Sequence, residues 1–283
     1  MNSIRKLEMN RRYEDGLKLC KHWGDDFSVI KKYLASIFDM DILGVRSRLE
    51  RADRFAVCDV GAGEGTITAH LVSLLLERAK KSTMITVDLI EPENSAAALL
   101  ANRLSTFSSR PNLKCGQHDV SAERFFSGKR DAAYDFILAS HSLYFIDMAV
   151  LQAMIAGVVR GGYLCTVLGA ESSWMSYFKD FFTKRPSVHG GTFLKAFDTS
   201  VRKGDWITDR QKIETRLDLG RMWWPSPDEI NDESKNMMSL ILQKDFDDLS
   251  SDDRKRVHGE ILAHLQKKRM MLDGDYFLSR REA

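Results

Sequence analysis

The chain has 283 residues, a formal net charge of +2 and an apolar fraction of 43%, which suits a globular protein with one large domain or a core with a sizeable addition. Lysine and arginine are scattered among acids, unlike the basic stripe of a nucleic-acid-binding protein, and no stretch approaches the ~18 apolar residues of a membrane span. Four widely spaced cysteines show neither metal-type nor redox-type pairing. We therefore expect a soluble, cytoplasmic protein, a monomer or a weak dimer, without nucleic acid, membrane or metal among its partners.

Apolar residues in the first 50 positions recur at spacings of three and four, which predicts two helices with a break near residues 23–26. This segment also carries Tyr13, Trp23, Asp26 and Phe27, a mixture that suits the wall of a pocket. Spacing alone fits both a purely packing segment and a lid across a ligand site. We treat residues 1–50 as a helical lid, with Tyr13 and Asp26 as candidate substrate-binding residues.

The stretch FAVCDVGAGEGTITAH, residues 55–70, is the strongest local signal in the chain. Its apolar run over residues 55–60 predicts a strand buried on both faces. Gly61, Gly63 and Gly65 follow, and Thr66 opens a predicted helix that runs to about residue 80. Glycines let a ligand approach the main chain closely, while the helix start supplies unpaired N–H groups and the positive end of a dipole. Together they indicate a nucleotide-binding corner.

A second predicted strand, residues 84–90, ends in Glu91-Pro92. In a doubly wound fold, a carboxylate at the tip of the second strand holds a ribose, because two neighbouring hydroxyls bind well to two acceptor oxygens. Asp88 is the competing acid, but it lies inside the strand, so we favour Glu91. A helix is expected over residues 93–107.

Two further strands are predicted over residues 112–115 and 134–139, and polar residues follow each of them. Asp119 and Ser121 are placed to bind an adenine edge, although either could instead cap the next helix. His141 and Tyr144 follow the fourth strand, and ligands of open α/β sheets bind outside the carboxyl ends of the strands. The fifth strand, residues 161–169, begins with a glycine pair that we expect to form a tight helix-to-strand turn.

Beyond residue 169 the chain is richer in aromatic residues. Trp174 and Phe178 occur at helical spacing, for which core packing is the plain explanation and a substrate pocket the functional one. Alternation over residues 213–219 predicts a half-exposed strand, while Thr208 and Gln211 would also make a helix capping box. Helices are expected over residues 232–244 and 251–270, and a last short strand over residues 275–278.

These elements predict an α/β fold, with a doubly wound, seven-stranded, mostly parallel Rossmann-like sheet, an N-terminal helical lid, and C-terminal helical and aromatic additions. We expect the lid at residues 1–50, a cofactor-binding core at residues 51–170, and substrate-side helices with the last strands at residues 171–283. All three parts should form one compact unit.

The glycine pattern also separates one nucleotide from another. The dinucleotide fingerprint G-x-G-x-x-G needs a glycine where this chain has Thr66, and the carboxylate of Glu64 would repel a pyrophosphate. The sequence contains no G-K-[ST] phosphate loop. A ligand with an α-amino group would instead be attracted by the acid, so the glycine turn and the ribose carboxylate together indicate S-adenosylmethionine.

The motifs VCDVGAGEGT, LIEPENSAA, HDVS, YDFILASHSLYF and GGYLCTVLG resemble the class I S-adenosylmethionine-dependent methyltransferases over about residues 55–169. More narrowly, the chain resembles the histamine N-methyltransferase family of small-molecule methyltransferases nearly end to end. That likeness runs through IEPENS, DFILASHSLYFID, GAESSWMSYFKDFF and the alternating strand before Trp223. The resemblance implies that a methyl group moves from S-adenosylmethionine to a nitrogen of a small amine or imidazole-like molecule.

The resemblance also implies roles for individual residues. Gly61 and Gly63 would back the methionine part of the cofactor, and Glu91 would hold its ribose. Asp26 matches an acid that faces the substrate amine, and His141 stands where that family has a substrate-binding glutamine. The complete cofactor-binding set is Asp59, Gly61, Gly63, Glu64, Glu91, Pro92, Asp119, Ser121 and Ser140. The aromatic residues expected around the substrate are Tyr13, Tyr144, Phe145, Trp174 and Phe178.

The expected reaction is in-line displacement at the sulfonium methyl group by a nitrogen, which needs mainly positioning and desolvation. His141 is the candidate proton acceptor, and Tyr144 is the second candidate catalytic residue. The alternatives are an O-methyltransferase, an enzyme acting on a peptide or natural-product scaffold, and a non-catalytic protein that keeps the fold as a binding module. An NAD-dependent oxidoreductase is disfavoured by Thr66 and Glu64.

Overall fold

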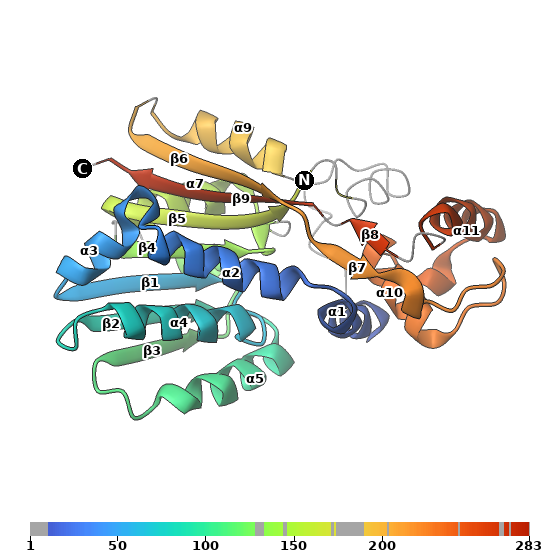
Figure 1. Cartoon of the computed structure of the whole chain (residues 1–283), viewed down its shortest axis with the longest axis horizontal. Helices are drawn as coiled ribbons and strands as arrows, with labels where there is room; N and C mark the ends of the chain where they lie inside the picture. Colours follow the sequence, from blue (N-terminus) through green and yellow to red (C-terminus); the bar gives the residue numbers. More distant parts are fainter. Residues whose placement is uncertain are drawn as a thin grey trace. The chain divides into compact units, whose positions relative to one another are not determined.

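The computed structural model forms two packed units, each drawn from three separate parts of the sequence (Figure 1). The larger unit comprises Ile30–Leu168, Gly190–Gln211 and Asp275–Ala283, and the smaller unit comprises Met1–Val29, Gly169–His189 and Lys212–Gly274. The residues that the structure describes are 11–127, 133–143, 146–170, 173, 190–202, 204–242, 244–265, 269–271 and 273–282.

A seven-stranded sheet forms the centre of the larger unit, with the strand order β3-β2-β1-β4-β5-β9-β6. The pairs β1–β2, β1–β4, β2–β3 and β4–β5 are parallel, and Figure 1 shows β9 running opposite to its neighbours β5 and β6. The predicted doubly wound, seven-stranded, mostly parallel sheet is therefore confirmed. The strands are β1 (Arg54–Val60), β2 (Met84–Ile90), β3 (Leu113–His118), β4 (Tyr134–Ser140), β5 (Val158–Gly169), β6 (Trp206–Ile213) and β9 (Gly274–Arg281).

Helices cover both faces of this sheet. One face packs against α6, α7 and α9, through Phe126, Met154 and Phe193 among others. On the other face Phe38 of α2 meets Phe136 of β4, with ring centroids 6.3 Å apart, and Figure 1 shows α2 and α4 in front of the strands. The helices are α2 (Asp26–Asp39), η2 (Ile42–Gly44), α3 (Val45–Arg51), α4 (Thr66–Arg78), α5 (Asn94–Leu104), η3 (Ser105–Phe107), α6 (Ala122–Phe126), α7 (Met148–Gly157) and α9 (Gly190–Ser200).

The central strand β1 shows why the apolar run at residues 55–60 predicts a strand. Cys58 and Val60 belong to the core cluster beside α6, α7 and α9, so the alternate residues Val57 and Asp59 point to the opposite face. All four side chains are buried. Two buried faces require apolar residues at nearly every position, and this produces a continuous run rather than an alternating one.

The glycine pair at Gly161-Gly162 does not form the expected helix-to-strand turn. Strand β5 already begins at Val158, and the pair lies inside it. Tyr134 of β4 pairs with Val158, whereas Phe136 pairs with Tyr163, so extra residues of β5 form a bulge between these two pairs. Gly161 adopts φ = 72° within it, a backbone conformation that glycine reaches without steric cost.

The smaller unit has its own core and a short two-stranded sheet. Trp23, Leu217, Met237, Phe246 and Ile261 belong to its buried cluster, and its strands β7 and β8 pair antiparallel. Its elements are α1 (Arg11–Trp23), β7 (Arg216–Asp218), η5 (Leu219–Arg221), α10 (Asp232–Leu242), η6 (Phe246–Asp248), α11 (Ser251–Leu265) and β8 (Arg269–Met271). Across the described part of the chain, no helix combines the length and the apolar character that crossing a membrane requires.

The break between the first two helices is confirmed, since α1 ends at Trp23 and α2 begins at Asp26. The strand predicted over residues 213–219 is divided instead, because β6 ends at Ile213 and β7 occupies Arg216–Asp218. The alternative of a helix capping box is wrong, because Thr208 lies in β6, where its hydroxyl meets that of Ser279 in β9 at 2.9 Å.

Candidate functional site

The turn between β1 and α4 depends on three glycines with positive φ. Gly61, Gly63 and Gly65 have φ values of 74°, 54° and 77°, a region that disfavours residues with a Cβ atom. The N–H groups of Gly61 and Ala62 donate to the carbonyl of Ile90 at 2.9 and 3.1 Å. The turn is thus attached to the tip of β2, and Gly65 stands at the N-terminus of α4.

Steric contacts explain Gly61 further and separate it from Gly63. A Cβ at Gly61 would lie 2.5 Å from the Cβ of Ser142, just beyond β4, whereas a Cβ at Gly63 would meet nothing within 4 Å. Gly61 is therefore needed for packing between the ends of β1 and β4. Gly63 instead faces open space at the carboxyl end of the sheet, where ligands of this fold class bind.

Glu91, at the tip of β2, is hydrogen-bonded to the glycine turn. One of its carboxylate oxygens accepts the N–H of Gly63 at 2.7 Å, and the other accepts the N–H of Glu93 at 3.0 Å. The side chain is 8% exposed. Burial raises the pKa of Glu91, the charge of Glu93 adds to the rise, and the two backbone hydrogen bonds oppose it. Each carboxylate oxygen keeps a further lone pair for a ligand donor.

A second acid, Asp59, is buried beneath the same turn. It is 2% exposed, and it accepts a hydrogen bond from the Thr68 hydroxyl of α4 at 2.6 Å. Burial raises the pKa of Asp59 to about 7, and the nearby charge of Glu91 contributes to the rise. Two buried carboxylates thus lie near one another below the glycine turn, which favours a cationic ligand at this place.

The tip of β3 brings Asp119 and Ser121 to the same end of the sheet. The Asp119 carboxylate accepts from the Gln117 amide at 2.9 Å. Ser121 caps α6 by accepting the N–H of Arg124 at 3.4 Å, the alternative that its sequence position had left open. Two more residues of the predicted cofactor set follow β1 and β2. Pro92 is exposed, and the main-chain oxygen of Glu64 accepts from the guanidinium of Arg103 at 3.0 Å.

The tip of β4 carries Ser140, His141 and Ser142. His141 has φ = 56°, one of few positive values at non-glycine residues, and its N–H donates to Val167 of β5 at 2.9 Å. Positive φ is uncommon for a residue with a Cβ atom, although histidine adopts it more readily than most. The buried hydroxyl of Ser142 has no hydrogen-bond partner among the described residues.

The predicted substrate residues are less completely described. Tyr144, Phe145, Trp174 and Phe178 lie outside the described residues. Tyr13 belongs to α1, but its side chain is also outside the description. Asp26 is the first residue of α2, is partly buried, and belongs to the smaller unit. The structure therefore brings together the cofactor candidates of the larger unit, and the substrate candidates stay predictions.

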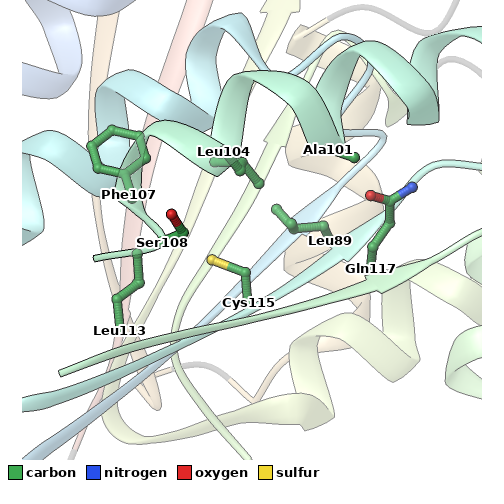
Figure 2. A pocket seen from close by; sticks show the side chains of 8 residues that line it. All are labelled: Leu89, Ala101, Leu104, Phe107, Ser108, Leu113, Cys115 and Gln117. Atoms are coloured by element: carbon green, nitrogen blue, oxygen red, sulfur yellow. The ribbon is translucent and has the colours of Figure 1, made fainter. Parts of the chain in front are cut away.

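A cavity of about 270 Å³ lies between α5, η3 and the strands β2 and β3. Figure 2 shows the side chains of Leu89 and Cys115 pointing toward α5 across this space. None of its lining residues carries a charge, and they are Leu89, Ala101, Leu104, Phe107, Ser108, Leu113, Cys115 and Gln117. Among the residues that the structure describes, no group of His, Cys, Asp or Glu side chains is arranged to hold a metal ion.

Comparison with solved structures identifies the fold. Over 86% of this chain and all of the other, the structure matches a provisionally described methyltransferase from Bacillus halodurans, with a TM-score of 0.54 at 11% identity. It also matches the YcgJ protein from Bacillus subtilis, covering 85% of this chain and 98% of that one with a TM-score of 0.53 at 13% identity. The fold is that of the class I methyltransferases.

A third match is a provisionally described sarcosine dimethylglycine methyltransferase from Galdieria sulphuraria, at a TM-score of 0.51 and 13% identity. It covers 89% of this chain and 85% of that one. No protein-family model matches the chain, and neither does any curated protein. One fold can host many chemistries, so the activity depends on the residues of the site.

Proposed function

We propose that this protein is an S-adenosylmethionine-dependent methyltransferase that transfers a methyl group to a nitrogen of a small amine or imidazole-like molecule. The observation that carries the proposal is the hydrogen bond between the Glu91 carboxylate and the Gly63 N–H. It joins a glycine turn with open space beside it to a buried acid at the tip of the second strand.

The chemistry of these residues supports binding of the cofactor. The free lone pairs of Glu91 are suitable acceptors for two ribose hydroxyls. Gly61 and Gly63 allow the methionine part to approach the main chain. The buried Asp59 and Glu91 favour a ligand with positive charge, as S-adenosylmethionine has on its sulfonium and amino groups. Asp119 lies after β3, where an adenine edge would be bound.

The cofactor supplies an activated methyl group, so the chain has to position the acceptor and exclude water. His141 would take the proton of the attacking nitrogen, with Tyr144 as the second catalytic residue. Asp26 would hold a cationic part of the substrate, and Tyr13, Phe145, Trp174 and Phe178 would pack around it and attract a cation.

Nitrogen is the preferred acceptor for two reasons. The sequence resembles the histamine N-methyltransferase family, and one structural neighbour is described as acting on sarcosine and dimethylglycine, both small amines. The same residues would also accommodate a hydroxyl acceptor, so a panel of acceptors must include phenols and peptides alongside amines and imidazoles.

The proposal is tested by calorimetric titration with S-adenosylhomocysteine. Wild type should bind it, and Glu91→Ala should lose affinity about tenfold or more, because a hydrogen bond to a charged group contributes about 1.5–3 kcal/mol. Glu77→Ala is the matched control, since Glu77 is an exposed acid on α4 whose side chain bonds Ser73 and Arg78 of the same helix. Unchanged affinity in Glu91→Ala would contradict the ribose assignment, and absence of wild-type binding would contradict the proposed function.

A further inference from the structure

Asp88, in the interior of β2, makes hydrogen bonds to side chains from strands on both sides of β2. Its Oδ1 lies 2.8 Å from Nε2 of His118, the last residue of β3. Its Oδ2 accepts the phenolic O–H of Tyr134 in β4 at 2.6 Å. Burial raises the pKa of Tyr134, so its hydroxyl stays protonated and acts as the donor. Asp88 is thus committed to side chains of two other strands and does not reach the strand tip.

Gly116 makes this arrangement possible. In the parallel ladder of β2 and β3, Asp88 pairs with Gly116, and Ile90 pairs with His118. The imidazole of His118 must therefore lean back across Gly116 to reach Asp88. A Cβ at Gly116 would stand 3.0 Å from Oδ1 of Asp88 and 3.4 Å from Nε2 of His118. Any side chain there would press directly on the pair.

The opposite side of the imidazole is covered by α6. The ring of Phe125 packs against that of His118, with centroids 4.7 Å apart. The N–H of Phe125 donates to the carbonyl of Ser121 at 3.0 Å. His118 is therefore held by Asp88 on one side and by α6 on the other. Asp119 and Ser121, which are proposed to bind adenine, lie between His118 and α6 in the sequence.

The backbone of His118 connects this network to the cofactor site. Its carbonyl accepts the N–H of Glu91 at 3.2 Å, and Asp119 is the next residue along the chain. An imidazole held in this way restricts the backbone that bears it, in addition to the ladder between β2 and β3. The separation between the ribose acid at the tip of β2 and the adenine side at the tip of β3 consequently depends on the Asp88–His118 pair.

We propose that Asp88 and His118 are positioning residues that set the purine–ribose end of the cofactor site. This inference rests on the proposed function. The pair acts through the main chain at His118, which presents Glu91 and Asp119 at the spacing that the nucleoside needs. A pair that only stabilised the fold would instead change thermal stability without changing affinity for the nucleoside.

The test measures melting temperature together with affinity for S-adenosylhomocysteine and for adenosine, which has the nucleoside alone. Gly116→Ala and His118→Ala should weaken both ligands by the same factor of about threefold to tenfold, the effect of one lost hydrogen bond. His118→Gln should restore much of the affinity, because its amide can still donate to Asp88.

Arg48→Ala is the matched control. Arg48 of α3 forms a comparable ion pair with Asp135 in β4 at 2.5 Å, and Asp135 also accepts the N–H of Ala56 in β1. Its loss should lower the melting temperature and leave both affinities unchanged.

Three outcomes would overturn the inference. One is wild-type affinity in Gly116→Ala and His118→Ala together with a lower melting temperature. The second is a larger loss for S-adenosylhomocysteine than for adenosine, which would mean general damage to the glycine turn. The third is failure of the wild type to bind either ligand, which would refute both the proposed function and this inference. If the wild type binds and the first or second result is seen, the inference alone is refuted.

Discussion

The carboxylate of Glu91 and the backbone N–H of Gly63 are joined by a hydrogen bond of 2.7 Å. The two residues belong to successive βα units, one after β2 and the other after β1. A side chain proposed to hold ribose is therefore oriented by the turn proposed to hold the methionine part. A substitution at either residue should affect the binding of both the ribose and the methionine part of the cofactor.

The glycines of the turn should differ in the stability that they contribute. Gly63→Ala should cost about 1 kcal/mol, the penalty of placing a Cβ at positive φ, because open space surrounds the site. Gly61→Ala should cost about 3 kcal/mol, since a collision with Ser142 adds an overpacking penalty. Urea unfolding compares the two variants. Equal midpoints would show that the contact between Gly61 and Ser142 relaxes without cost.

Asp59 should make the protein less stable as the pH rises. Its folded pKa of about 7 lies above the usual value of 3.8, so between these values the folded state holds a proton that the unfolded state has lost. Stability from this group therefore falls by about 2 kcal/mol between pH 5 and pH 7. Asp59→Asn keeps an acceptor for Thr68 and cannot ionise. The variant should match wild type near pH 4 and exceed it at pH 8 in denaturant titrations; a constant difference would contradict the shifted pKa.

His141→Asn should separate catalysis from folding. Asparagine tolerates positive φ better than most residues, so the backbone conformation at the tip of β4 should persist. Affinity for S-adenosylhomocysteine should be kept while methyl transfer to the best acceptor falls about a hundredfold, the scale of general base catalysis. The exposed His22, in the last turn of α1, provides the control His22→Asn. Full turnover in His141→Asn would remove His141 from the mechanism.

Two helical glycines of the smaller unit should respond to alanine in opposite directions. A Cβ at Gly16 of α1 would lie 2.3 Å from the Asn236 carbonyl and 2.8 Å from the Cβ of Leu240, both in α10. A Cβ at Gly259 of α11 would meet nothing within 4 Å. Gly259→Ala should stabilise the protein by about 0.5–1 kcal/mol through helix propensity, whereas Gly16→Ala should destabilise it by about 2 kcal/mol through overpacking. The melting temperatures of the two variants test this prediction. Stabilisation by Gly16→Ala would mean that α1 and α10 can move apart without cost.

Local sequence patterns predicted the central strands because burial on both faces leaves a visible signature. Met84–Ile90 is a strand with the predicted bounds. The position of Glu91 directly after this strand is confirmed in the same way, and its role in binding ribose stays a prediction. The bulge at Gly161 was not found, because a glycine pair serves a turn and a bulge equally well. Only the pairing of Tyr134 with Val158 and of Phe136 with Tyr163 distinguishes the bulge from a turn.

The side-chain contacts at the site could not be predicted from the sequence, for a related reason. Asp88 and His118 meet diagonally across Gly116, and that meeting depends on the register between β2 and β3. Register is a tertiary property that leaves little trace in either strand alone. For the same reason, the cap that Ser121 forms on α6 is established only by the geometry of α6, and contact between Ser121 and adenine stays a prediction.

The position of β9 has a consequence for biosynthesis. In the sheet β9 lies between β5 and β6, although β6 ends at Ile213 and β9 begins only at Gly274. A nascent chain that has not yet passed residue 274 holds β6 without the strand that joins it to the sheet, and β5 has an open edge. Unpaired edges invite pairing with other chains. Ribosome stalling within this interval should therefore produce aggregation-prone fragments, and chaperone demand should be highest until the last strand emerges.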